Sequence, residues 1–189
     1  MSHDDPALRS DEELAQLVGD VHPHDAPIAL HHYDAAWPAR FDREAERIRG
    51  ALGDAAIAIE HVGSTSVPSL AAKPIVDIVL AVADSAYEPG YKPALEGVGY
   101  ILRIREADEH EHRMFERHDP ATHVHVFTVG DPEIQRMVAF RDRLRSSRDD
   151  RERYEATKRQ LAARRWRHVQ HYADAKSDVI ARILSGRST

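Results

Sequence analysis

The stretch HVGSTSVPSLAAKPIVDIVLAV, residues 61–82, decides the fold. It contains a Gly-Ser turn that follows a short apolar run, AAIAIEHV at residues 55–62, and it ends in a run at residues 74–82 that is rich in β-branched residues and apolar on both faces. Such runs are typical of the central strands of a sheet. We therefore predict neighbouring strands at residues 57–62 and 75–82, with the turn of residues 63–66 at the mouth of a cleft.

The flanking sequence completes an α+β plan. From Pro38 to Gly53, apolar residues recur at three-to-four spacing, which predicts an amphipathic helix packed on a flat surface. A segment at residues 87–97 is compatible with a short helix. Alternation typical of half-buried antiparallel strands follows at residues 100–106, 112–118 and 122–129. From residue 131 the period becomes helical and predicts three closing helices. We expect a small mixed β-sheet flanked by helices, with a C-terminal helical segment.

Length and composition are those of one ordinary domain. The chain has 189 residues, 42% of them hydrophobic, and contains no cysteine, which excludes disulfides, a thiolate nucleophile and Cys-type zinc sites. It shows neither a signal peptide nor an apolar run of about 20 residues, so we expect a soluble, cytoplasmic protein without a membrane partner. The net charge of -6 disfavours binding to long nucleic acid.

Residues 1–26 have the character of an N-terminal arm. They hold one short helical candidate at residues 11–18, followed by VHPHDAP, whose prolines and acids are typical of a linker. We expect this arm to contribute little to the core and residues 27–189 to form the domain.

The Gly-Ser turn has the outline of a phosphate-binding loop. Gly63 allows a sharp turn, which brings backbone amides and the hydroxyls of Ser64, Thr65 and Ser66 near an anion, and Lys73 adds a cation before the next strand. The alternative is that the segment is only a turn.

Asp77 lies inside an apolar strand, where a carboxylate needs a cationic partner or a metal. Lys73 or backbone amides are one solution. His123 and His125 are two residues apart on a predicted strand and so share one face, and His61 borders the turn. Imidazole suits zinc or a transition metal better than magnesium, and it can also serve as an acid or base near neutral pH. A surface or satisfied-core role is the alternative for each histidine.

Three other histidines, His110, His112 and His118, lie in the charged stretch DEHEHRMFERH, and we expect them to be solvated.

The spacing of the turn and the acid resembles the signature of polymerase-β-like nucleotidyltransferases, in which the turn holds nucleotide phosphates and strand acids hold magnesium. The segments ALHHYDAAWPARFDREAERI, HVGSTSVPSLAAKPIVDI, HVHVF, FRDRLR, YEATKRQLA and YADAKSDVI together resemble the GrpB family over about residues 28–184. Ser69 stands where that family usually has glycine. The family is assigned to the superfamily mainly by fold and motif, so the resemblance implies a sheet of nucleotidyltransferase type.

The resemblance also implies a set of site residues. The family keeps basic residues in the C-terminal helices, which makes Arg141 and Lys158 candidates to line a ligand cleft, with ordinary surface charge as the alternative. The candidate nucleotide-binding or phosphate-binding residues are Gly63, Ser64, Thr65, Ser66, Lys73, Arg141 and Lys158. Candidate catalytic residues are Asp77, His123 and His125, which with His61 are also the candidate ligands of a divalent metal, either Mg²⁺ or a transition metal.

Two functions fit this pattern. The first is transfer of a nucleotidyl group from a nucleoside triphosphate to an unknown small acceptor. The second is a non-catalytic nucleotide-binding, CoA-type ligand-binding or accessory module, since the family resembles a domain found fused to dephospho-CoA kinase. Val79 favours the second, because strand alternation places it where a second acid would stand and two-metal chemistry uses several carboxylates.

Overall fold

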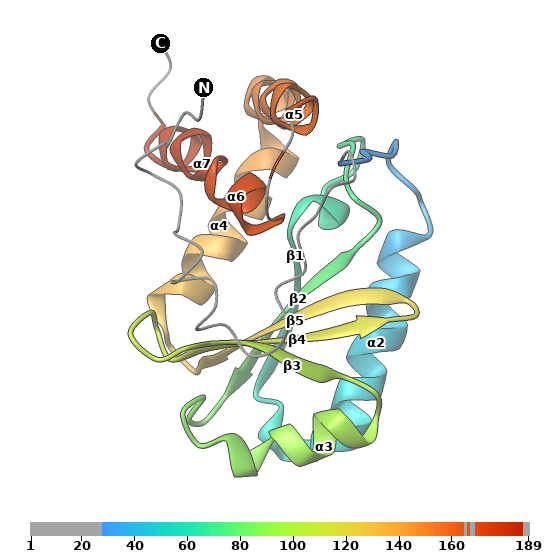
Figure 1. Cartoon of the computed structure of the whole chain (residues 1–189), viewed down its shortest axis with the longest axis vertical. Helices are drawn as coiled ribbons and strands as arrows, with labels where there is room; N and C mark the ends of the chain where they lie inside the picture. Colours follow the sequence, from blue (N-terminus) through green and yellow to red (C-terminus); the bar gives the residue numbers. More distant parts are fainter. Residues whose placement is uncertain (1–27, 165, 167–168, 187–189) are drawn as a thin grey trace.

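The structure, a computed structural model, describes residues 28–164, 166 and 169–186. The arm expected at residues 1–26 lies outside the described residues. The described chain forms one mixed sheet in the order β1-β2-β5-β4-β3, with helices packed on it (Figure 1). This is the predicted α+β architecture, which is confirmed.

The strands lie close to their predicted positions. Their bounds are β1 Ala58–Val62, β2 Val76–Val82, β3 Ile101–Glu106, β4 His112–His118 and β5 Ala121–Thr128. As predicted, β1 and β2 are neighbours, and they pair antiparallel. The sheet is mixed because β5 pairs parallel with β2 on one side and antiparallel with β4 on the other.

The helices surround this sheet. They are α2 Trp37–Leu52, α3 Lys92–Gly97, α4 Pro132–Ser146, α5 Arg148–Ala162, α6 Val169–Asp174 and α7 Ser177–Leu184, with 3₁₀ turns at Gly53–Ala55, Ser64–Ser66 and Glu88–Gly90. The prediction of three closing helices is wrong, since the described part of the C-terminal region holds four. The last apolar repeat continues through residues 175–176, where the backbone makes a turn that separates α6 from α7.

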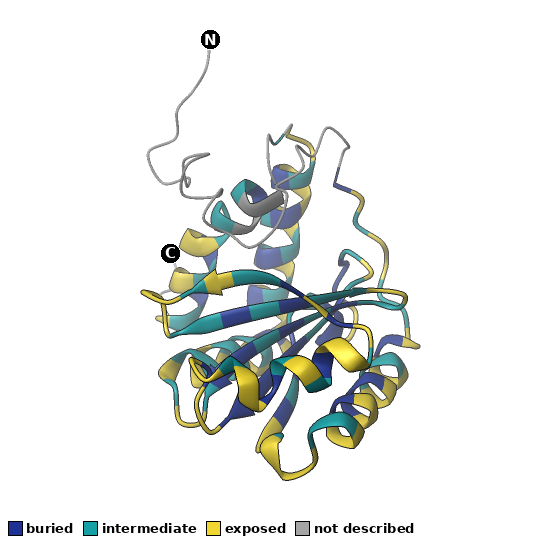
Figure 2. Ribbon diagram, turned by 60° about the horizontal axis from the view of Figure 1, so that its bottom comes forward, coloured by how far each residue is buried: buried dark blue, intermediate teal, exposed yellow. Residues whose placement is uncertain are grey.

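The two faces of the sheet have different cores. On one face, Ile78 and Leu80 of β2 pack with Ile48 of α2 in the largest apolar cluster. On the other, Val79 and Phe127 pack with partly buried side chains of α4. Figure 2 shows how the buried residues concentrate in the central strands. Because neighbouring residues of a strand point to opposite faces, residue 77 faces the C-terminal helices rather than α2.

No helix among the residues that the structure describes is both long enough and apolar enough to cross a membrane.

Candidate functional site

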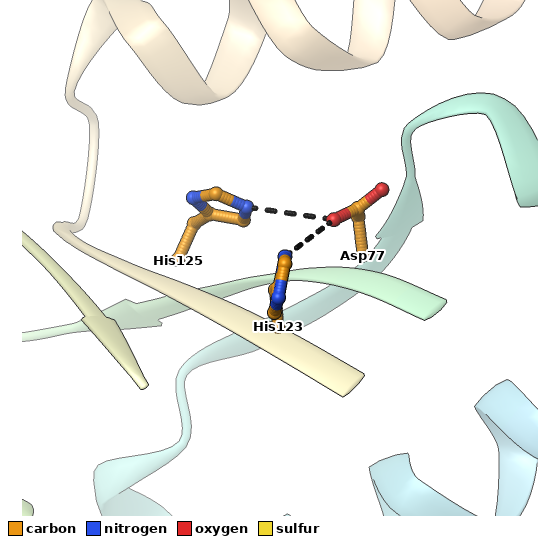
Figure 3. A group of neighbouring side chains, drawn as sticks. All are labelled: Asp77, His123 and His125. Atoms are coloured by element: carbon orange, nitrogen blue, oxygen red, sulfur yellow. Dashed lines mark ion pairs between the residues drawn. The ribbon is translucent and has the colours of Figure 1, made fainter. Parts of the chain in front are cut away.

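Asp77, His123 and His125 form the centre of the site. In the parallel ladder of β2 and β5, Asp77 is paired with His123 and Val79 with His125, so all three polar side chains emerge from one face. Figure 3 shows them pointing toward one another, with His123 Nδ1 3.5 Å and His125 Nε2 3.8 Å from Asp77 Oδ1. Burial would raise the pKa of Asp77, but the interactions of its carboxylate with His123 and His125 outweigh it and hold that pKa well below its usual range.

The donor atoms of this cluster fit a metal ion. One carboxylate oxygen and two imidazole nitrogens lie within 4.8 Å of one another. Their separations from Asp77 Oδ1 are near the roughly 3.4 Å between adjacent ligands of a tetrahedral zinc ion with bonds of about 2.1 Å. Two imidazoles and one carboxylate suit zinc and transition metals better than magnesium, and three protein ligands leave a coordination position open for another molecule.

A hydrogen-bonded chain behind His125 supports the same interpretation. His112 Nδ1 lies 2.7 Å from Glu106 Oε2, and His112 Nε2 lies 3.1 Å from His125 Nδ1. When Glu106 is ionised and both imidazoles are neutral, His112 donates to Glu106 and accepts from His125 Nδ1–H. His125 Nε2 then keeps its lone pair, which faces the Asp77 carboxylate. A cation between these two atoms satisfies both, and this is the arrangement of many metal-bound histidines.

The expectation that His112 is solvated is wrong. Its ring is stacked on His125 at 5.3 Å and on Phe127 at 4.8 Å between centroids, and its side chain is only 13% exposed. The charged local sequence suggested a solvated segment, but the pairing of β4 with β5 carries His112 to the site. His110 and His118 do have exposed side chains.

The structure does not bring His61 to this cluster. In the antiparallel pair of β1 and β2, His61 lies opposite Ile78 and therefore on the face covered by α2. Its ring stacks on Phe41 with centroids 4.7 Å apart, and its Nε2 lies 3.2 Å from Thr65 Oγ1. Burial lowers the pKa of His61 to about 4. Its geometry is that of a buried support for the turn.

The Gly-Ser turn packs directly against the cluster. Gly63 has φ +67°, and the hydroxyl of Ser66 turns inward to donate to the Gly63 carbonyl at 2.6 Å. Because Thr65 contacts His61, two of the three hydroxyls are used inside the protein. The hydroxyl of Ser64 accepts a hydrogen bond from Lys158 Nζ at 3.0 Å. The Ser64 hydroxyl and the backbone amides are therefore the groups of the turn that remain to bind an anion.

The turn and the cluster open onto one cavity of about 350 Å³, a size typical of small-molecule sites. Lys73, Lys158 and Lys176 line it together with apolar side chains such as Ile104 and Met114. Burial lowers the pKa of all three lysines, to about 7 for Lys158 and about 8 for Lys176. Three lysines thus share a cavity with a candidate metal site.

Lys176 was not among the predicted site residues. A signal was present in the sequence, because Lys176 stands in register with the apolar residues Tyr172, Val179 and Ile183 of the last helical repeat. A lysine on the buried side of a helix needs a partner, and here it faces the cavity.

The structure also places Arg141 and Val79. Arg141 does not line the cavity; its Nη1 donates to Glu60 Oε2 at 2.7 Å and to the His61 carbonyl at 3.0 Å. Val79 is 1% exposed and belongs to the apolar cluster beneath α4. The position of a possible second acid is therefore filled by core packing, and the site has a single acid on β2.

The fold and the site define an α+β protein whose mixed sheet carries an Asp-His-His cluster beside a Gly-Ser turn. The chain belongs to the GrpB family: the family model described as GrpB protein matches residues 27–186. It is 56% identical over 177 residues to a UPF0157 protein of Halalkalibacterium halodurans, covering 93% of this chain and 91% of the relative.

A solved structure supports the fold. The crystal structure of the conserved protein GrpB from Enterococcus faecalis matches with a TM-score of 0.73 and 30% identity, over 84% of this chain and 96% of the other. A more distant relative is a dephospho-CoA kinase of Mycolicibacterium paratuberculosis, 32% identical over 178 residues, where the match covers 80% of this chain but 44% of the kinase.

Proposed function

We propose that this GrpB-family protein is a metal-dependent nucleotidyltransferase that moves a nucleotidyl group from a nucleoside triphosphate to a small acceptor. One observation carries the proposal: a three-ligand cluster for a divalent ion and three lysines line the same cavity, so the ion and a phosphate chain can meet there. The resemblance of the turn and Asp77 to the nucleotidyltransferase signature supports the choice of reaction.

Each residue has a distinct role in this proposal. Asp77 and His125 would hold the divalent ion, and His123 would either complete its shell or move a proton; a bound ion would polarise a phosphoryl oxygen as a Lewis acid. Ser64 and the backbone amides after Gly63 orient the phosphates, while the lysines neutralise charge that develops on them. The apolar part of the wall restricts water around the reacting groups.

The acid–base step falls to the site's imidazoles. His123 lies beside Asp77 at the cavity wall, so it can accept the proton of the acceptor group if His125 remains in the metal shell. Glu106 and His112 hold the ring of His125 in place, as the hydrogen-bonded chain shows. Neither role needs a second carboxylate on β2.

A non-catalytic module that binds a nucleotide or a CoA-type ligand is the second candidate. Burial of Val79 in an apolar cluster favours it, because the site lacks the paired strand acids with which two-metal enzymes hold ions about 4 Å apart. The similarity to part of a dephospho-CoA kinase points in the same direction.

Two measurements on the full chain separate these candidates. Thermal shift with nucleotides and dephospho-CoA, each with Mg²⁺, Mn²⁺, Co²⁺ or Zn²⁺, identifies the ligand, since a ligand at 100 times its Kd adds about 2.7 kcal/mol. Pyrophosphate release from each nucleoside triphosphate, with mixed small acceptors, then tests transfer. Ion-dependent release that is lost in Asp77→Asn supports the enzyme. Tight binding without release supports the module.

A further inference from the structure

Three lysines of the cavity form no ion pair with a carboxylate among the residues that the structure describes. Lys73 precedes β2, Lys158 lies on α5 and Lys176 lies at the start of α7, yet all three line the same cavity. Within the described part of the chain, none of the ion pairs includes any of them, whereas Lys92 on α3 pairs with Glu96. Lys158 is buried and the other two are half-buried, and lysines are almost never buried unless they are paired, so this arrangement calls for a partner.

The contacts of Lys158 and Lys176 are with neutral groups. Lys158 is 2% exposed and donates to Ser64 Oγ and to the Ala71 carbonyl, and its Nζ lies 4.9 Å from the ring centre of Tyr154. Lys176 Nζ lies 4.6 Å from the ring centre of Tyr172. These contacts orient the ammonium groups without cancelling their charge.

Several acids surround the three lysines, and most of them also face other cations. Lys158 interacts electrostatically with Lys176, Glu155, Arg159 and Asp77. Lys176 interacts in the same way with Asp77, Lys73 and Asp174. Glu155 already accepts hydrogen bonds from Arg159 and from the Ala71 amide. Asp77 is the acid that both lysines share, and it faces the two histidines at the same time. Lys73 interacts with Asp77 and with Glu116, which accepts a hydrogen bond from Arg103. Glu106, which also lines the cavity, is hydrogen-bonded to His112. Among the described residues, Asp77 is therefore the carboxylate that all three lysines share.

We propose that Lys73, Lys158 and Lys176, with the Ser64 hydroxyl, form a binding site for a phosphate group with two negative charges, such as a phosphomonoester or the end of a di- or triphosphate. Lys176, from the C-terminal helices, makes the site selective for a dianion over a monoanionic phosphodiester. That this phosphate is part of the substrate rests on the proposed function. The charge complementarity itself does not need the metal.

Binding of such an anion draws a proton into the site. Burial lowers the pKa of Lys158 to about 7 and that of Lys176 to about 8, and a bound dianion raises both again. Above pH 7 the free protein therefore holds fewer protons than the complex. Affinity for a dianion that does not itself titrate, such as sulfate, falls as the pH rises from 7 to 9.

Calorimetric titration of the full chain in EDTA tests the inference without any metal. The probes are pyrophosphate, inorganic phosphate and sulfate, with dimethyl phosphate as the monoanion, all at constant ionic strength. We expect all three multivalent anions to bind. Sulfate, which does not itself titrate, should bind with proton uptake, visible as a dependence of the heat on the buffer. Dimethyl phosphate should bind at least about tenfold more weakly, since a charge-assisted hydrogen bond is lost.

Lys176→Met and Lys73→Met should each weaken pyrophosphate binding about tenfold, while the matched surface change Lys92→Met should leave it unaltered. Equal binding of dimethyl phosphate and pyrophosphate, or unchanged binding in Lys176→Met, overturns the inference. So does the absence of dianion binding in EDTA. The proposed function can fail separately. If the chain binds dianions in EDTA but releases no pyrophosphate from nucleotides with any ion, the anion-site inference stands and the proposed enzymatic activity is refuted.

Discussion

Gly63 and Asp77 are in direct contact across the turn between β1 and β2. A Cβ atom built on Gly63 would lie 2.9 Å from both Cβ and Cγ of Asp77, which is closer than Cβ atoms approach in real proteins. Gly63 also has φ +67°, a conformation that favours glycine. The turn can therefore approach the carboxylate of the Asp-His-His cluster only because residue 63 has no side chain.

Gly63→Ala tests this contact. The new methyl group meets Asp77 in addition to the cost of a positive φ, so we expect a loss of more than about 2 kcal/mol in the free energy of unfolding. Gly130→Ala is the matched control, since Gly130 has φ +85° and no atom within 4 Å of a built Cβ; it should lose only about 1 kcal/mol. Urea denaturation measures both. Equal losses would mean that the contact with Asp77 is unimportant.

Asp77→Asn should keep the fold but lose ion binding, because the amide has the shape of the carboxylate without its charge. We expect the ion-dependent shift in melting temperature with Co²⁺ or Zn²⁺ to disappear. Val79→Ala is the complementary change: it should cost about 1–3 kcal/mol of stability through a cavity in the apolar cluster and leave the ion-dependent shift in place. An unchanged response to every ion in Asp77→Asn would refute the assignment of Asp77 as a ligand.

His112→Phe tests the hydrogen-bonded chain from Glu106 to His125. Phenylalanine keeps the stacking on His125 and Phe127 but cannot hydrogen-bond, so His125 loses the partner that sets its tautomer. We expect the affinity for Co²⁺, measured by its absorption spectrum, to fall about 10- to 100-fold. His118→Phe, at an exposed histidine on the same strand, is the control and should bind Co²⁺ as the parent protein does. Equal affinities in the two variants would contradict a positioning role.

His61 should make the protein less stable in mild acid. Burial lowers its pKa from 6.5 to about 4, so between these values the unfolded chain holds a proton that the folded chain lacks, and the free energy of unfolding falls as the pH drops. His61→Gln should reduce this slope by up to about 1.4 kcal/mol per pH unit. Burial also lowers the pKa of His125, which contributes in the same direction and is unchanged in the variant.

Denaturant melts from pH 4.5 to 6.5 measure the slope for the parent and for His61→Gln. The variant is expected to be less stable overall, because it loses the stacking on Phe41. Parallel pH profiles would show that His61 does not titrate differently in the folded and unfolded chains.

Local pattern was enough to predict the strands. Alternation and β-branched composition placed β2 and β5 within two residues, because a strand buried on both faces has few other ways to hide its side chains. The same alternation put Asp77 on the face of Val79, and His123 on the face of His125. Helix count was less predictable, because the period of an apolar repeat continues across the turn between α6 and α7.

Strand pairing and helix docking, in contrast, are contacts between distant segments, and they are hard to predict from any short stretch of sequence. His61 and Asp77 both border the turn, yet the register of β1 on β2 sends His61 to the opposite face. His112 sits in a charged segment, and only the pairing of β4 with β5 places it behind His125. The amino-acid sequence by itself determined which residues could carry chemistry, since side-chain type and alternation are local properties. Tertiary structure alone decided which of them meet, because strand register and helix docking join distant segments of the chain. The docking of α5 and α7 brings Lys158 and Lys176 to a cavity that is also lined by Asp77 of β2, about a hundred residues earlier in the sequence.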